Sequence, residues 1–168
     1  MKLFWKIVNK KCGFLNAISG QLYMKVRIKA LKKLGVVING HPSYIDPSAY
    51  FDGEGYDKIV LNEGCVISRN VTLLVHDYSI TRALKAIDKS QGLVKVLENI
   101  EIGENSFVGA SALLLPGTSI GKNVIVGGGG AVVKGMVDDN IVVAGNPAKK
   151  IRSIEEYARK WMDKHEEK

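Results

Sequence analysis

The sequence predicts an all-β parallel β-helix built from six-residue repeats, with a helical arm before it and a short helix after it. Between residues 102 and 132, an aliphatic residue recurs at every sixth position, and glycine follows it at 103, 109, 121 and 127. An α-helix has a period of 3.6 residues and cannot keep such a register over several repeats. A short strand that ends in a sharp turn makes one side of a triangular coil, and three such sides complete one turn.

A second regularity supports this prediction. The fourth residue after each aliphatic one is mostly small, as at Ser106, Ala112, Thr118 and Gly130, where a corner of the coil leaves little space. The same register appears upstream, at Ile45, Phe51, Leu61, Ile67 and Leu73. It then stops until Ile102, so we expect a loop of residues 79–99 to leave a β-helix domain of residues 36–152.

The first 35 residues predict a basic amphipathic helical arm. Leu3, Phe4, Ile7 and Val8 form an apolar stripe, and Gly35 is a plausible end. The whole chain has a net charge of +7. Residues 1–45 carry nine basic side chains and no acidic one. Two interpretations stay open: the arm lies on an anionic membrane surface, or it packs on the coil or a neighbouring subunit. Nucleic acid is not expected, because no stacking aromatic residues alternate with the charges.

The last 16 residues, 153–168, predict a C-terminal helix. Ser153 and Glu156 form a capping box, and Ile154, Tyr157, Ala158 and Trp161 follow at helical spacing. We expect this helix to pack on the open end or the side of the coil.

Composition narrows the setting of the protein. Lysines at 6, 10 and 11 interrupt the apolar start, so no signal peptide is expected, and no apolar run reaches the length of a membrane span. The two cysteines, Cys12 and Cys65, are too few for a disulfide framework. We therefore expect a cytoplasmic protein, in peripheral contact with a membrane if the arm binds lipid.

Several stretches make the chain resemble the hexapeptide-repeat acyltransferases. They are residues 102–105 (Ile-Gly-Glu-Asn), residues 115–121 (Leu-Pro-Gly-Thr-Ser-Ile-Gly) and residues 144–149 (Ala-Gly-Asn-Pro-Ala-Lys), with part of the match in 67–80. Within the family, the chain is similar to the maltose, galactoside and capsular-polysaccharide O-acetyltransferases. The resemblance implies a left-handed β-helix, acetyl-CoA as co-substrate, and a homotrimer whose active sites lie between subunits.

The resemblance also implies a catalytic histidine just before the long loop, where this chain has His76. A base with a pKa near neutrality suits removal of a proton from an acceptor hydroxyl. Asp77 and Tyr78 follow as candidate substrate contacts. On an extended strand Asp77 points away from His76, so a turn carboxylate is an equally good interpretation of that residue.

Coenzyme contacts are implied on the same basis. The pantetheine arm is expected along Ala110 and Gly128, and Val133 and Lys134 are expected beside it. Lys149 and Arg152 suit the phosphates, because both side chains pair well with phosphate oxygens. No metal is expected, since a metal site in this fold needs several histidines on adjoining turns. His41 and His165 are expected outside the coil.

These observations predict an acetyl-CoA-dependent O-acetyltransferase that acts on a hydroxyl of a sugar or surface-polysaccharide precursor. Two alternatives stay open. A non-catalytic β-helix scaffold would need neither His76 nor the pair of Lys149 and Arg152. An N-acetyltransferase of amino sugars often carries a nucleotide-binding front domain, and no glycine-rich strand–turn–helix fingerprint is present.

Overall fold

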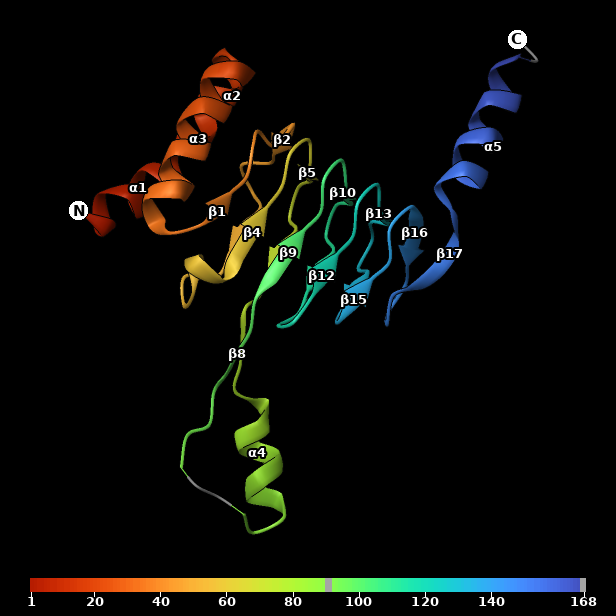
Figure 1. Ribbon diagram of the computed structural model, residues 1–168. Helices are drawn as coiled ribbons and strands as arrows, with labels where there is room; N and C mark the ends of the chain where they lie inside the picture. Colours follow the sequence, from red (N-terminus) through yellow and green to blue (C-terminus); the bar gives the residue numbers. More distant parts are fainter. Residues whose placement is uncertain (90–91, 167–168) are drawn as a thin grey trace.

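The computed structural model describes residues 1–89 and 92–166, with side chains up to residue 163. Along the chain it consists of a helical arm, a coil of short strands with one excursion, and a final strand and helix (Figure 1).

Three sheets of parallel strands form the sides of the coil. The strands of the first sheet are β1 (Val37–Ile38), β4 (Ile59–Leu61), β9 (Ile100–Ile102), β12 (Ser119–Ile120) and β15 (Met136–Val137). Those of the second are β2 (Tyr44–Ile45), β5 (Val66–Ile67), β10 (Phe107–Val108), β13 (Ile125–Val126) and β16 (Ile141–Ala144). Those of the third are β3 (Tyr50–Phe51), β6 (Thr72–Leu73), β11 (Leu113–Leu114) and β14 (Val132–Val133). The chain visits the three sheets in rotation, and each round is one turn of the coil.

The segments between the sheets make three corners, and most of the candidate site residues lie at these corners. The first corner joins the first sheet to the second, through residues 39–43, 62–65, 103–106, 121–124 and 138–140. The second corner joins the second sheet to the third, through residues 46–49, 68–71, 109–112 and 127–131. The third corner joins the third sheet back to the first, through residues 52–58, 74–99, 115–118 and 134–135.

The six-residue register is confirmed over most of its length and wrong at its end. Ile102, Val108 and Leu114 are fully buried, and Ile120 and Val126 also point inward. The next inward residue was predicted at 132, but Val133 is the buried one and pairs with Leu114, while Val132 is half-exposed. The predicted small residue at the corner, Gly130, is correspondingly exposed, and Ala131 is buried in its place. The glycine run before β14 therefore contains one extra residue.

The glycine after each aliphatic residue has a packing reason. A Cβ on Gly103 would lie 2.1 Å from the carbonyl oxygen of Gly121, in the next turn of the coil. A Cβ on Gly109 would lie 2.5 Å from the backbone nitrogen of Gly128. Neighbouring turns approach too closely there for any side chain, which is a recognised use of glycine.

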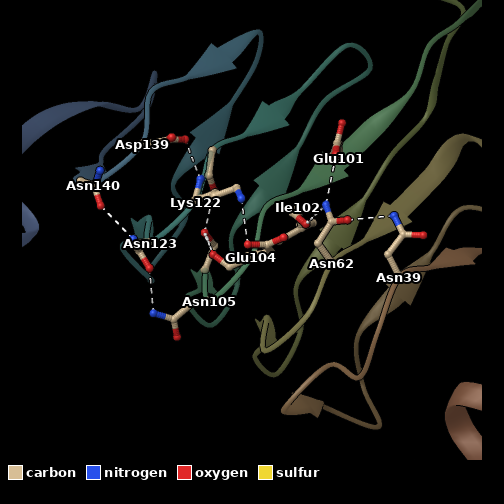
Figure 2. Close-up of polar contacts among 12 residues, drawn as sticks. Asn39, Asn62, Glu101, Ile102, Glu104, Asn105, Lys122, Asn123, Asp139 and Asn140 are labelled. Atoms are coloured by element: carbon tan, nitrogen blue, oxygen red, sulfur yellow. Dashed lines mark hydrogen bonds and ion pairs between the residues drawn. The ribbon is translucent and has the colours of Figure 1, made fainter.

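Asparagine performs the turn at the first corner. Asn105, Asn123 and Asn140 all have positive φ, between 52° and 59°, a conformation that asparagine tolerates better than most residues. Their amides form a ladder from turn to turn (Figure 2): Nδ2 of Asn105 donates to Oδ1 of Asn123 at 2.9 Å, and Nδ2 of Asn123 donates to Oδ1 of Asn140 at 2.8 Å. The ladder satisfies these polar groups along the coil axis.

The helical arm caps the first turn of the coil. It consists of α1 (Lys2–Lys11), the 3-10 turn η1 (Cys12–Phe14), α2 (Leu15–Ile18) and α3 (Gly20–Leu34). In α3, Tyr23 and Leu31 are fully buried, and the Tyr23 hydroxyl donates to the Ile45 carbonyl at 2.6 Å. The guanidinium of Arg27 donates to the carbonyls of Asn9 at 2.6 Å and Ala49 at 3.0 Å, so it joins α1, α3 and the coil. One face of the arm therefore packs on the coil.

The excursion at the third corner is more ordered than a loop. Strand β7 (His76–Asp77) pairs antiparallel with β8 (Val96–Leu97), and α4 (Ser79–Ala86) lies beyond them. The short 3-10 turn η2 (Tyr56–Lys58) precedes β4 at the same corner. In Figure 1 the excursion projects away from the coil, and residues 90–91 of the predicted loop lie outside the described part.

The C-terminal segment covers a sheet edge. Strand β17 (Lys149–Ser153) pairs antiparallel with β16, and α5 (Ile154–Glu166) follows it. The predicted capping box is confirmed: Ser153 N donates to Glu156 Oε2 at 2.7 Å, and Glu156 N donates to Ser153 Oγ at 3.0 Å. Tyr157 lies half-buried against the outer face of the second sheet. The far end of α5 points away from the coil (Figure 1). Helix α5 thus meets the side of the coil through its first two turns, where Tyr157, Lys160 and Trp161 line a groove with Val142 and Ala144.

Candidate active site

His76 lies at the third corner, where the chain leaves the coil. The preceding Leu73 and Val75 are fully buried and fix the position of the backbone. The imidazole is partly open, with 22% of its side chain exposed. Its Nδ1 hydrogen-bonds to Oδ2 of Asp52, which comes from the previous turn of the coil. A base that is both held and accessible therefore stands at this corner.

Asp52 is the residue that the sequence prediction missed. Its side chain is 1% exposed, and it accepts backbone N–H groups from Glu54 at 3.1 Å and Val75 at 3.1 Å. Asp52 follows the inward residue Phe51, which pairs with Leu73 in the next turn. An acid directly after a strand, one turn before a candidate histidine, was the available signal.

This pair has a definite chemical meaning. A carboxylate that accepts Nδ1–H fixes the ring and its tautomer, which leaves the lone pair of Nε2 free to take a proton. Because Asp52 is buried, water does not compete for the bond. The arrangement is that of a general base with an orienting acid.

Asp77 has a structural role here. Its Oδ1 accepts the backbone N–H of Ser79 at 2.7 Å, and its Oδ2 accepts the Ser79 hydroxyl at 2.8 Å. These two bonds lower the pKa of Asp77, and the nearby charges of Lys134 and His76 lower it further. Of the two interpretations left open, the turn carboxylate that starts α4 is the one that the geometry favours.

Tyr78 and Lys134 complete the surroundings of His76. The Tyr78 ring stands edge-on to the imidazole, with 5.3 Å between ring centroids, and 36% of the residue is exposed. Lys134 directly follows β14 at the same corner and is exposed. An ion pair that was not predicted joins Lys95, just before β8, to Glu54 of the previous turn of the coil, with 3.2 Å between Nζ and Oε2. This contact raises the pKa of Lys95.

Ala110 and Gly128 lie together, but at the second corner. The backbone N–H of Gly129 donates to the Ala110 carbonyl at 2.8 Å, and a Cβ on Gly128 would stand 3.0 Å from that oxygen. A Cβ on Gly129 or Gly130 would meet nothing within 4 Å, so this backbone faces open space. The exposed Lys149 lies beside this corner, because it pairs with Ala144 at the end of β16.

Val133 and Arg152 depart from the predicted coenzyme contacts. The Val133 side chain is buried, and its carbonyl already accepts Leu115 N at 2.9 Å and Thr118 Oγ1 at 2.9 Å. The structure therefore gives Val133 a packing role, because the glycine run shifts it inward. Arg152 pairs with Val142 and lines a small groove of about 280 Å³ with Tyr157, away from the corner.

A single chain thus separates the candidate residues into two sets. His76, Asp77, Tyr78 and Lys134 share the third corner, whereas Ala110, Gly128 and Lys149 share the second. The width of the third sheet lies between them. One copy of the chain holds a base at one end of these strands and an open stretch of glycine backbone at the other.

The prediction that His41 lies outside the coil is wrong. His41 lies at the first corner, in the first turn, where its backbone N–H donates to Glu63 Oε2 at 2.7 Å and its carbonyl accepts Gly64 N at 3.0 Å. It is therefore on a different corner from His76. Among the described residues, no group of three or more His, Cys, Asp or Glu side chains is placed to hold a metal ion.

Comparison with known proteins agrees with this architecture. The family profile described as Bacterial transferase hexapeptide (six repeats) matches residues 94–134. Protein CapG of Staphylococcus aureus is 34% identical over 134 residues, which cover 79% of this chain and 74% of CapG. These repeats and this relative define the class: the chain belongs to the hexapeptide-repeat acyltransferase family.

Two further similarities are informative. Galactoside O-acetyltransferase of Escherichia coli K12 is 30% identical over 107 residues, which cover 64% of this chain and 47% of that protein. A solved structure of a galactoside acetyltransferase in complex with coenzyme A superposes with a TM-score of 0.64 at 22% identity, covering 91% of this chain and 80% of that one. The latter similarity concerns the fold. The chain spans about half the length of some curated relatives, 47% for both the E. coli protein and a Saccharomyces cerevisiae relative.

None of the helices in the described part of the chain combines the length and the apolar character that crossing a bilayer requires.

Proposed function

We propose that the chain is an acetyl-CoA-dependent O-acetyltransferase that acts on a hydroxyl of a sugar or surface-polysaccharide precursor. One observation carries the proposal: the Nδ1 of His76 is held by the buried Asp52 at the corner where the excursion leaves a hexapeptide coil. Membership of the acyltransferase family and the similarity to galactoside O-acetyltransferase support the reaction class.

The residues of the third corner divide the work as follows. Asp52 keeps the Nδ1–H tautomer of His76, and Nε2 takes the proton of the acceptor hydroxyl as its oxygen attacks the thioester carbonyl. The bond from acyl carbon to sulfur then breaks, and the proton on Nε2 passes to the leaving thiolate. Tyr78, edge-on to the imidazole, forms a wall against which a sugar ring can pack. A positioned base contributes roughly 10²–10⁴-fold to such a reaction.

Acetyl-CoA supplies the acyl thioester. The residues at the second corner fit this co-substrate, because the backbone of residues 128–130 is open and Lys149 stands beside it. Lys149 suits a phosphate oxygen. Arg152, on β17 with Lys149, remains a candidate for the phosphate end of the coenzyme.

The candidate residues of the third corner and those of the second corner are too far apart to act together within one copy, so the site requires a neighbouring copy. We propose a homotrimer of left-handed coils in which the third corner of one copy faces the second corner of its neighbour. Rotational symmetry then builds three equal sites from sets that one copy keeps apart. Because Cys12 and Cys65 are both free thiols, we propose that the protein works in the cytoplasm.

The function is tested by incubating the chain with acetyl-CoA and a panel of sugars. Acetyl transfer is measured from the release of the coenzyme thiol and from the mass of the product. A sugar that gains one acetyl group, in a form that alkaline hydroxylamine removes, supports O-acetylation. A product that resists hydroxylamine indicates an amide and therefore an amino-sugar acceptor. Absence of both transfer and coenzyme binding would contradict the proposal and favour a scaffold.

A further inference from the structure

The helical arm carries several exposed large apolar side chains. Six large apolar residues of the arm are between 44% and 72% exposed: Leu3, Phe4, Ile7, Phe14, Ile18 and Leu22. In α1, residues three and four apart share a face, so Leu3, Phe4 and Ile7 form one continuous patch. So many large apolar residues in one segment mark a surface that meets a partner.

The opposite side of α1 packs against α3. Trp5 and Val8 are half-buried and Cys12 is 4% exposed, where α1 packs on α3. The Lys29 ammonium lies 6.0 Å from the centre of the Trp5 ring. The packing of the arm on the coil, one of the two interpretations of the sequence, therefore accounts for one face of α1 and leaves the other free.

The same region is strongly basic. Residues 1–45 hold nine Lys and Arg and no acidic residue, and Lys6, Lys10 and Lys11 border the apolar patch on α1. A groove of about 870 Å³ runs between α3 and the first turn of the coil, with Met24, Ile28 and Tyr44 among its walls. Four lysines also line this groove: Lys25, Lys29, Lys32 and Lys33.

We propose that the arm docks the protein on an anionic lipid bilayer, with α1 and α2 lying in the membrane interface. An exposed apolar face flanked by lysines is the pattern of an interfacial helix, and anionic headgroups complement the charge. A second copy of this chain is disfavoured as the occupant, because two such basic surfaces would repel each other. A nucleic acid would match the charge but leave the apolar face in water.

The position of the arm makes this docking compatible with the proposed function without depending on it. Because α3 packs on Ile45 and Ala49, in the first turn, the arm occupies one end of the coil (Figure 1). Docking through that end leaves the three sides and the excursion free. In the proposed trimer, three arms share one end and bind the bilayer together, which strengthens attachment through multivalency.

The test is sedimentation of the full chain with vesicles. One set contains phosphatidylcholine alone, and the other is equimolar in phosphatidylcholine and phosphatidylglycerol. The wild-type chain should sediment with the anionic vesicles, and high salt should weaken the binding. A variant that combines Leu3→Ser, Phe4→Ser and Ile7→Ser, and one that combines Lys6→Gln, Lys10→Gln and Lys11→Gln, should each bind at least about tenfold more weakly.

Matched controls lie outside the arm. Met136→Ser removes a side chain that is 83% exposed on β15, and Lys85→Gln with Lys89→Gln removes two charges from the excursion. Both should bind like the wild type, and circular dichroism and light scattering should show every variant folded with the wild-type mass. A wild-type chain that stays in the supernatant with anionic vesicles would overturn the proposal. So would arm variants that sediment normally, or arm variants that change only the mass of the assembly or the binding of an oligonucleotide.

Discussion

The carboxylate of Asp52, in one turn of the coil, accepts a hydrogen bond from Nδ1 of His76, in the next turn. Because Asp52 also accepts backbone N–H groups from Glu54 and Val75, its position is set before any substrate binds. The structure thus links the proposed base to the coil through a buried group, and this link can be tested directly.

Asp52→Asn should act on catalysis rather than on coenzyme binding. The amide cannot hold the Nδ1–H tautomer as the carboxylate does, so we expect kcat to fall by about 10²–10⁴-fold, with the KM for acetyl-CoA nearly unchanged. Steady-state kinetics of thiol release measures both values. The exposed Asp57→Asn, at the same corner, is the control and should change neither. Equal loss of coenzyme affinity would indicate a structural role instead.

The corrected register predicts unequal effects at adjacent valines. Val133→Ala empties a core position and should lower the free energy of unfolding by roughly 1.5–3 kcal/mol, whereas Val132→Ala, on the half-exposed side, should cost less than about 1 kcal/mol. Denaturant unfolding followed by circular dichroism compares the two. The opposite order would show that the six-residue register continues unbroken through the glycine run.

Arg27 should be essential for the attachment of the arm. It is 2% exposed, it donates to the carbonyls of Asn9 and Ala49, and its guanidinium lies 5.6 Å from the centre of the Phe51 ring. Arg27→Ala leaves the buried Ala49 carbonyl and the partly buried Asn9 carbonyl without this donor, so we expect a loss of roughly 2–4 kcal/mol in the free energy of unfolding. Lys25→Ala, on the exposed side of α3, is the matched control. If both variants unfold at the same denaturant concentration, the arm is not held by Arg27.

The start of α4 should depend on pH. Hydrogen bonds from the Ser79 backbone and hydroxyl lower the pKa of Asp77, so its carboxylate stabilises the folded form above the unfolded pKa, about 3.9. This contribution is lost as pH falls through the lower folded pKa. Amide-exchange protection of residues 79–86 should therefore be retained at neutral pH and decrease below about pH 4. Asp77→Ala should show weak protection at every pH, and an identical pH profile for both proteins would refute the role of Asp77.

The repeat made the coil predictable because each inward position is set by local spacing. Ala110 and Gly128 were expected along the coenzyme from the family resemblance alone, and the structure places them on neighbouring turns of the second corner. The shift at residues 127–130 was not readable, because four glycines satisfy either register. Asp52 was missed since its contact with His76 is formed only when two turns stack. Helix α4 was missed although Ile80, Ala83 and Leu84 recur at helical spacing, because the break in the six-residue register was interpreted as a loop.

The most direct test of the central claim is to compare the wild-type chain with His76→Ala for the transfer of acetyl from acetyl-CoA to its best sugar acceptor. Calorimetric binding of the coenzyme serves as the control. The account predicts that kcat falls by about 10²–10⁴-fold in the variant while coenzyme affinity is retained. Transfer that continues at the wild-type rate would contradict it and assign the base to another residue.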